Sequence, residues 1–240
     1  LERLTKATAG DQVLGEYTYH TNGNIKTKTG IGRYTYSAEH PHAVAKVDNT
    51  DKSVSKYTQT AEYNGFGKVS RLTERPAILR PFGNATTLSF LYGSDRSRWK
   101  TELKKGTKLL RTTLFGEDYE QVEADGVTTR YLYAGHGVVY VSRKSSSGNT
   151  GNYYYMVTDH LGSVHGLLEA DGNRVLSWKY DAWGQQETEK TSDAVTFYRG
   201  YGGHEMLPEF GLINMNGRMY DPLLARFLSP DDYVQMPMSP

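Results

Sequence analysis

Aromatic residues that recur two positions apart are the feature that most constrains the fold of this chain. Six such pairs occur along its 240 residues: Tyr17/Tyr19, Tyr34/Tyr36, Phe90/Tyr92, Tyr131/Tyr133, Tyr153/Tyr155 and Trp178/Tyr180. Residues two apart share one face of a β-strand, whereas in a helix they point about 200° apart, at ~100° per residue. The pairs therefore predict β-strands from one end of the chain to the other.

A second spacing places glycines at the ends of these strands. Four glycines follow a tyrosine by four residues: Gly23, Gly67, Gly137 and Gly184. Because glycine adopts positive φ without a steric penalty, the spacing is typical of a strand, a tight turn and a returning strand. Repetition of this unit predicts an array of antiparallel hairpins rather than a single globule.

Three segments carry more specific predictions. Val164–Leu168, the turn at Asp171-Gly172-Asn173 and Val175–Tyr180 are expected to form one hairpin. Ser142–Asn152 is expected to be the tip of a long hairpin. Asp221–Leu228 is the best candidate for a short helix.

Composition supports sheets with wet surfaces. The chain has 19 Tyr and 25 Gly, and its mean hydropathy is −0.64. So many aromatic residues argue against disorder, while tyrosine suits half-buried strands because its hydroxyl can stay hydrated. A sheet wetted on both faces, with rows of tyrosine between neighbouring strands, is expected to need little conventional core.

Charge and cysteine content exclude several classes of function. The 28 basic and 27 acidic residues leave a net charge of +1, which gives no electrostatic basis for binding nucleic acid or an anionic membrane. Without cysteine, there is neither a disulfide framework nor thiolate chemistry. No apolar run is long enough to span a bilayer, and no signal peptide is visible, so we interpret the chain as a fragment without membrane insertion.

The repeats and the C-terminal third resemble a known family. The Tyr-x-Tyr-x-x-x-Gly-Asn-Ile pattern that ends at Ile25 resembles the YD repeat of Rhs proteins, toxin-complex C subunits, wall-associated proteins and teneurins. Further segments resemble the Rhs-associated core in family order: Thr158–Val164, Asp171–Asn173, Tyr180–Gly184, Tyr201–Glu205, Gly211–Ile213, Asn216–Asp221, Pro222 and Arg226–Asp231. Ala225 stands where the family usually has glycine.

The resemblance implies a fold and an organisation. The family fold is a long antiparallel ribbon that spirals into a hollow shell, so we expect an all-β chain whose hairpin repeats form a curved, spiralling sheet. Residues 1–152 are interpreted as degenerate YD-repeat hairpins, and residues 153–240 as the last repeats with the Rhs-associated core. The second part is expected to continue the first rather than form an independent domain. Open sheet edges would need a partner strand or self-association.

The same resemblance implies a candidate catalytic pair. In polymorphic-toxin relatives, the core cuts its own chain with two aspartates and a nearby arginine. Asp231 matches the first aspartate, and Arg218 matches the arginine before Tyr-Asp-Pro, while the second aspartate is expected beyond residue 240. Two close carboxylates sharing a proton can act as acid and base. The alternative is that Arg218, Asp221, Arg226 and Asp231 form a structural network of ion pairs and turns.

Other residues carry weaker signals. The seven histidines include the pairs His40/His42 and His160/His165, but no spacing predicts a metal site. Asp159, His160 and Ser163 are the residue types of a hydrolase triad, yet adjacency in sequence is not triad geometry. Gly200-x-Gly202-Gly203 lacks the Lys-Ser/Thr and helix of a phosphate loop. We therefore expect no metal and no cofactor.

Three functions remain open at this point. The preferred hypothesis is a non-enzymatic module that encapsulates or presents a C-terminal effector. Its partners would be the rest of the parent chain and that effector. The first alternative is a cell-surface repeat protein that binds glycans or a partner cell. The second is an incomplete self-cleaving aspartyl protease. All three place the parent protein outside a bacterium, either secreted or in its envelope.

Overall fold

The chain is all-β and antiparallel in the computed structural model, which describes residues 3–36, 38, 44–48, 58–75, 83–135, 137–192 and 194–229. The helical element among these residues is a single 3-10 turn, Tyr201–Gly203. No helix in the described part is long and apolar enough to cross a membrane. The chain divides into two compact units, residues 1–56 with 231–240, and residues 57–230. The predicted fold class, antiparallel hairpins in a curved sheet, is confirmed.

The first unit is a five-stranded sheet in sequence order. Its strands are β1 (Lys6–Ala9), β2 (Gln12–Tyr19), β3 (Ile25–Lys28), β4 (Gly32–Tyr36) and β5 (Val44–Asp48). Tyr17 and Tyr34 start the first two aromatic pairs, and both are buried together with Ile25 and Ile31. The alternating pattern therefore gives this small sheet one apolar face.

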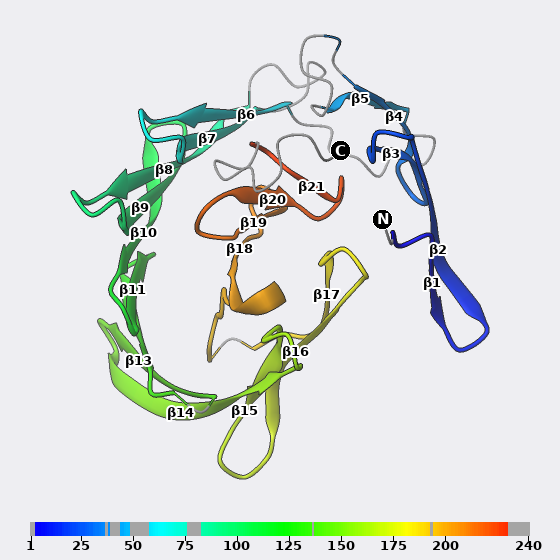
Figure 1. The fold of residues 1–240 in the computed structure, drawn as a ribbon. Helices are drawn as coiled ribbons and strands as arrows, with labels where there is room; N and C mark the ends of the chain where they lie inside the picture. The colour runs from blue at the N-terminus through cyan, green and yellow to red at the C-terminus, as the bar shows by residue number, and fades with distance from the viewer. Residues whose placement is uncertain are drawn as a thin grey trace. The chain divides into compact units, whose positions relative to one another are not determined.

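The second unit is built around a twelve-stranded sheet whose neighbours in space are neighbours in sequence. Its strands are β6 (Thr58–Tyr63), β7 (Val69–Arg75), β8 (Thr86–Tyr92), β9 (Arg98–Lys105), β10 (Lys108–Phe115), β11 (Tyr119–Ala124), β12 (Val127–Tyr133), β13 (Val138–Ser145), β14 (Gly148–Thr158), β15 (Val164–Leu168), β16 (Arg174–Tyr180) and β17 (Gln186–Lys190). This sheet, called the wall below, curves strongly, and the strands follow one another around the curve (Figure 1). The predicted hairpin of β15 and β16 is confirmed.

One turn geometry recurs along both sheets. The last strand residue pairs with the residue six positions later at seven turns: Tyr19/Ile25, Tyr63/Val69, Tyr92/Arg98, Tyr133/Val139, Thr158/Val164, Leu168/Arg174 and Tyr180/Gln186. In each turn the fourth residue after the strand has positive φ, and six of these residues are glycines. The exception is Arg96 (φ 63°). The glycine spacing in the sequence therefore marks real turns.

Shorter turns connect other strand pairs. β9 and β10 join through the pair Lys105/Lys108, and β11 and β12 join through Ala124/Val127. β13 and β14 pair from Val138/Tyr155 to Ser145/Gly148, so Ser142–Asn152 is the tip of a long hairpin, as predicted. β14 runs through residue 152, and the interpretation of residues 1–152 and 153–240 as two parts stays a prediction.

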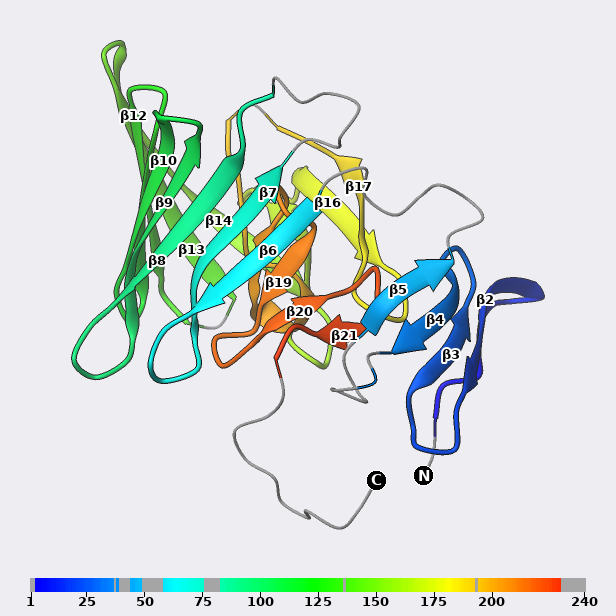
Figure 2. The same ribbon diagram turned by 90° about the horizontal axis from the view of Figure 1, so that it is seen from above.

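A four-stranded sheet lies on the concave side of the wall. It comprises β18 (Glu205–Leu207), β19 (Leu212–Asn214), β20 (Met219–Asp221) and β21 (Arg226–Phe227), and together with the residues before it forms the inner segment, residues 194–229. Both views place this segment inside the curve (Figures 1 and 2). The predicted helix at Asp221–Leu228 is wrong. Here β20 turns into β21, and Ala225 (φ 54°) occupies a left-handed conformation that a helix lacks.

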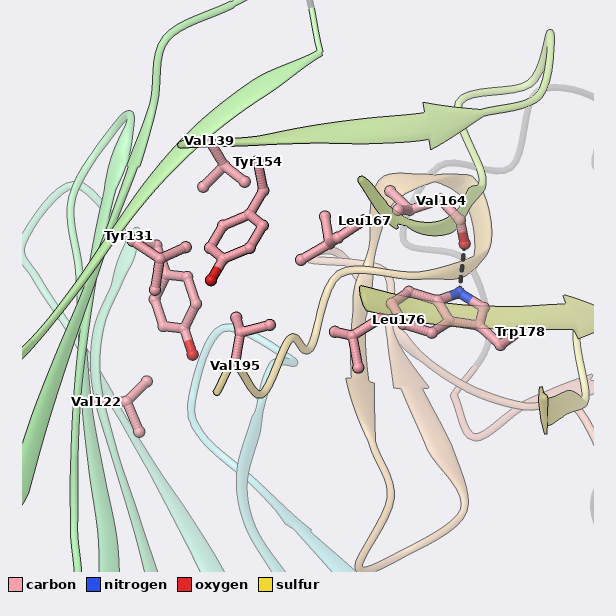
Figure 3. Packing of buried hydrophobic residues seen from close by; sticks show 10 residues of the cluster. Val122, Tyr131, Val139, Tyr154, Val164, Leu167, Leu176, Trp178 and Val195 are labelled. Carbon is pink, nitrogen blue, oxygen red and sulfur yellow. Dashed lines mark hydrogen bonds between the residues drawn. The ribbon is translucent and has the colours of Figure 1, made fainter. Parts of the chain in front are cut away.

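The expectation of a wall wetted on both faces is also wrong. Two apolar clusters cover its concave face. The first joins Tyr131, Trp178 and other wall residues to Val195 of the inner segment (Figure 3). The second joins Leu88 and Phe90 of the wall to residues of the inner sheet, among them Leu207, Phe210, Leu212 and Met219. The inner face of the wall is packed with apolar side chains. The low mean hydropathy of the chain therefore comes from polar residues elsewhere, chiefly on exposed surfaces.

Candidate functional site: the inner face of the wall

Side chains from six wall strands reach the inner segment, and this contact is the most elaborate feature of the described residues. Hydrogen bonds or ion pairs connect the two through Gln59, Tyr63, Arg98, Arg111, Glu120, Tyr131 and Arg143. The inner segment is therefore attached along the whole curve from β6 to β13.

Three ion pairs form the charged part of this contact. Arg98 of β9 binds Glu205, and both side chains are only 11% exposed. Arg111 of β10 donates to Glu209 through both terminal nitrogens, at 2.5 and 3.2 Å. The third pair runs in the opposite sense, since Arg199 of the inner segment donates to Glu120 of β11.

Aromatic rings support these cations. The guanidinium carbon of Arg98 lies 3.8 Å from the ring centroid of Phe115, and that of Arg111 lies 4.6 Å from the ring of Tyr198. Cations over aromatic faces are attracted by the ring quadrupole, more strongly when desolvated. Each arginine is thus fixed by a carboxylate and a ring together, and each pair defines one position of the inner segment against the wall.

Buried tyrosines of β12 complete the contact. Tyr131 donates to the carbonyl of Thr196 at 2.5 Å, and Tyr133 donates to Glu120 at 3.2 Å. Burial, and then nearby charge from Glu120 and other groups, raises the pKa of both phenols well above the ordinary value. They stay neutral and act as hydrogen-bond donors rather than as acids or bases near neutral pH.

The predicted catalytic pair is only half placed. Asp231 lies outside the described residues. Arg218 lies between β19 and β20, and its guanidinium carbon sits 3.9 Å from the ring centroid of Phe227 on β21. That contact holds Arg218 against its own small sheet. The catalytic roles of Asp231 and Arg218 therefore stay predictions.

Asp159 and Ser163 of the β14–β15 turn have structural hydrogen-bond partners. Asp159 accepts hydrogen bonds from the backbone of Leu161 and Ser163, at 2.9 and 2.8 Å, and lies 3.5 Å from His165. The hydroxyl of Ser163 instead accepts from the backbone N–H of Gly202 at 3.1 Å. Desolvation opposes ionisation of Asp159, but these hydrogen bonds outweigh it and lower its pKa. The arrangement shapes a turn and attaches it to the inner segment.

The arginines and glutamates of the ion pairs are the residues that sequence reasoning missed. Arg111 lies two residues before the buried Thr113 on β10, and Glu120 lies two residues before the buried Val122 on β11, so each charged residue shares the inward face of its strand. A charged residue at an inward-facing position was the available signal, because buried charges are normally paired. No group of three or more His, Asp and Glu residues in the described part of the chain is placed to hold a metal ion.

Sequence comparison places these features in a family. The family model "Teneurin YD-shell" matches residues 123–238, which include β12–β17 and the inner segment. The chain is 27% identical over 256 aligned positions to the tRNA nuclease WapA of Bacillus subtilis strain 168, covering 96% of this chain. These two matches support an Rhs/YD-repeat protein.

Two further relatives match 89% and 27% of this chain. The tRNA(Glu)-specific nuclease WapA of Bacillus subtilis subsp. natto is 28% identical over 214 residues. The uncharacterised protein YlbH of Escherichia coli K12 is 35% identical over 65 residues, which is 27% of this chain. The chain spans only 10% of the length of WapA from strain 168.

Solved structures share the fold of this Rhs/YD-repeat chain. The crystal structure of TcdB2-TccC3 superposes with a TM-score of 0.72 at 15% identity, covering 96% of this chain and 13% of that one. The form without the hypervariable C-terminal region gives the same TM-score at 17% identity. The predicted family and its shell-type β-fold are confirmed, and the described part is a structural shell module.

Proposed function

We propose that this module forms part of a wall that shields or presents an effector belonging to the same parent chain, and that the module itself is not an enzyme. The observation that carries the proposal is the attachment of the inner segment to six wall strands. Its ion pairs and buried hydrogen bonds hold chain against the concave face. A concave face that already binds one segment of the chain in this way can position a further segment, and this role requires no catalysis.

The proposed partners and location follow from the same relatives. The rest of the parent chain would continue the sheet, and the effector would lie on the concave side. Wall-associated and toxin-complex relatives support a secreted or cell-envelope location in a bacterium. The wall has two edge strands, β6 and β17. If the chain self-associates through one of them, we expect β6, because β17 carries Glu187, Glu189 and Lys190 and charged edge strands resist pairing.

Limited proteolysis of the natural parent chain tests the proposal. In a parent with an intact wall, we expect the segment encoded after residue 240 to resist added protease. Arg111→Ala combined with Glu209→Ala removes a buried attachment and should expose that segment. The exposed pair Lys179–Glu187 provides the matched control, since Lys179→Ala with Glu187→Ala should leave protection unchanged. Equal digestion of the wild type and the Arg111/Glu209 variant would rule out shielding.

Glycan binding is a second candidate, favoured by the convex face of the wall. Tyr119, Leu132, Tyr140 and Tyr153 are paired in turn across β11, β12, β13 and β14 and form one row. Tyr119, Leu132 and Tyr153 are exposed. A glycan array probed with the wild-type chain and with Tyr153→Ala tests this: a glycan signal that depends on Tyr153 favours adhesion, and a blank array rejects it.

Self-cleavage is the third candidate and rests on the match of Asp231 and Arg218 to the family pattern. In the longer parent, Asp231→Asn should abolish cleavage while Ser163→Ala should leave it intact. Mass spectrometry of the purified parent gives a direct answer, because an uncut wild-type chain would reject the protease.

A further inference from the structure

Two tyrosine rings on the convex face of the wall are in direct contact. Tyr140 of β13 and Tyr153 of β14 are cross-strand partners, and their ring centroids lie 4.8 Å apart with the ring planes inclined at 48°. The two strands pair over eight successive residues without a bulge. Side chains directly opposite each other on such a pair have Cβ atoms about 4.5–5.5 Å apart. The backbone therefore holds the two rings together, and they meet without any rearrangement of the strands.

A glycine on β14 makes room for the Tyr140 ring. Gly151 lies two residues before Tyr153 and opposite Ser142, and an added Cβ there would collide with the Tyr140 hydroxyl. Because Gly151 does not have positive φ, its backbone conformation does not require glycine. Glycine weakens a strand interior and often marks the close approach of another group. Here that group is the Tyr140 ring, which reaches across to the strand that carries Tyr153.

Exposure distinguishes this pair from other tyrosine contacts. Tyr153 is 58% exposed and Tyr140 is half-buried, so a soluble oxidant can reach the pair. Two other pairs of tyrosine rings lie farther apart, Tyr180–Tyr201 at 5.6 Å and Tyr34–Tyr36 at 6.4 Å. Tyr34 is buried, and the hydroxyl of Tyr180 donates to the carbonyl of Val164 at 2.8 Å. Close ring contact and access to solvent therefore coincide at Tyr140 and Tyr153.

These rings have the geometry for an oxidative cross-link, which in a chain without cysteine cannot be a disulfide. We propose that Tyr140 and Tyr153 are joined as dityrosine when the chain meets a one-electron oxidant of the peroxidase class acting with hydrogen peroxide. Each phenol loses one electron and one proton and becomes a phenoxyl radical. The two radicals form a carbon–carbon bond between ring positions ortho to the hydroxyls, and the two ortho protons shift to the phenol oxygens. Hydrogen peroxide takes up the two electrons and two protons and becomes two water molecules.

The cross-link would covalently close the long hairpin of β13 and β14. A bond between Tyr140 and Tyr153 encloses the hairpin tip, and closing a loop restricts the unfolded chain more than the folded one. The folded hairpin already holds the rings in contact, so the bond should stabilise the wall locally. The inference is independent of the proposed shielding function, because it needs only this hairpin and an oxidant.

Peptide mapping after treatment with a peroxidase and hydrogen peroxide tests the proposal. Trypsin cleaves after Arg143 and Lys144, so Tyr140 and Tyr153 fall in different peptides, residues 131–143 and 145–174. We expect a linked pair of these peptides whose mass is the sum of the two less two hydrogen atoms, together with dityrosine fluorescence. Oxidation of methionine adds an oxygen atom instead and is told apart by mass. Absence of the linked pair from the oxidised wild-type chain would overturn the proposal.

Variants assign the cross-link to this pair. Tyr140→Phe and Tyr153→Phe should each remove the linked peptide, and Gly151→Ala should reduce its yield by displacing the Tyr140 ring. Tyr155→Phe is the matched control, because Tyr155 is 47% exposed on the same face of β14 but lies opposite Val138 and Leu168. It should cross-link as the wild type does.

The same variants show what would contradict the assignment. An undiminished yield in Tyr153→Phe, with circular dichroism unchanged, would place the bond elsewhere. Linked peptides found only in covalent dimers on a denaturing gel would show that the bond joins two chains, and this would also overturn the proposal. A yield in the monomer band that does not depend on protein concentration is the result expected for a bond within one hairpin.

Discussion

The aromatic pairs of β12 and β14 are alike in sequence and opposite in position. Tyr131 is 2% exposed and faces the inner segment, whereas Tyr153 is 58% and Tyr155 47% exposed on the convex face. In β14 it is the intervening Tyr154 that is buried, at 5%. The spacing of two identifies a strand in both cases, but by itself it does not identify the inward face.

The turn glycine sets the face. Tyr133 is the last residue of β12, four positions before Gly137, and its pair occupies the inward positions before that turn. Counting back four from Gly162 gives Thr158, so the inward positions of β14 are Met156 and Thr158. Tyr153 and Tyr155 are out of phase by one residue, and a shift of one residue moves a side chain to the other face.

The largest expected effect comes from truncating inward tyrosines. Tyr131→Ala and Tyr154→Ala should each lower the free energy of unfolding by about 3 kcal/mol, because each leaves a cavity in a packed cluster. Denaturant titration followed by circular dichroism measures the change. A loss below about 1 kcal/mol at both positions would contradict the assigned faces.

The turn glycines give the next effect. Gly184 and Gly172 have similar φ, 86° and 85°, but an added Cβ would meet the Tyr201 ring at 2.8 Å only at Gly184. Gly172→Ala should cost about 1 kcal/mol for the left-handed backbone alone. Gly184→Ala should cost more, about 2 kcal/mol, because Tyr201 must also move. Equal losses in denaturant titrations would show that Tyr201 yields freely.

The stability of the protein at high pH tests which tyrosine side chains are buried. Burial raises the pKa of Tyr131, Tyr133 and Tyr180, so these groups keep their protons in the folded state, while the unfolded state releases them above pH ~10. The free energy of unfolding is therefore unaffected by the ionisation of these groups below that pH. It falls as pH rises, by up to about 1.4 kcal/mol per pH unit for each phenol. Denaturant titrations between pH 9 and 11 should show a shallower decline for Tyr133→Phe. An unchanged slope would place its phenol in water.

The smallest effect is expected on the convex face. Tyr153→Ala should cost about 0.5 kcal/mol, because the ring of Tyr153 lies 4.8 Å from that of Tyr140 across the strands but faces solvent. Thermal unfolding of this variant beside Tyr154→Ala compares neighbouring residues on opposite faces. Equal shifts in the two midpoints would break the comparison.

Local pattern explains what could be predicted. Strands and turns depend on spacings within ten residues, so the aromatic pairs and glycines revealed them, including the β15–β16 hairpin. The Tyr92 turn was obscured because Arg96 takes the left-handed position that glycine occupies elsewhere. The ion pairs join residues 79 to 107 positions apart, and no short-range pattern encodes which glutamate meets which arginine.

The order of strands in the wall has a consequence for how the molecule assembles. Every wall strand after β6 pairs with its immediate predecessor, so each hairpin can add to the growing sheet soon after synthesis, without waiting for distant chain. The inner segment follows the wall in the sequence and needs partners from six wall strands that precede it. We expect a late docking step, visible as amide protons of β18–β20 that gain protection after those of β8–β13 in pulsed hydrogen exchange.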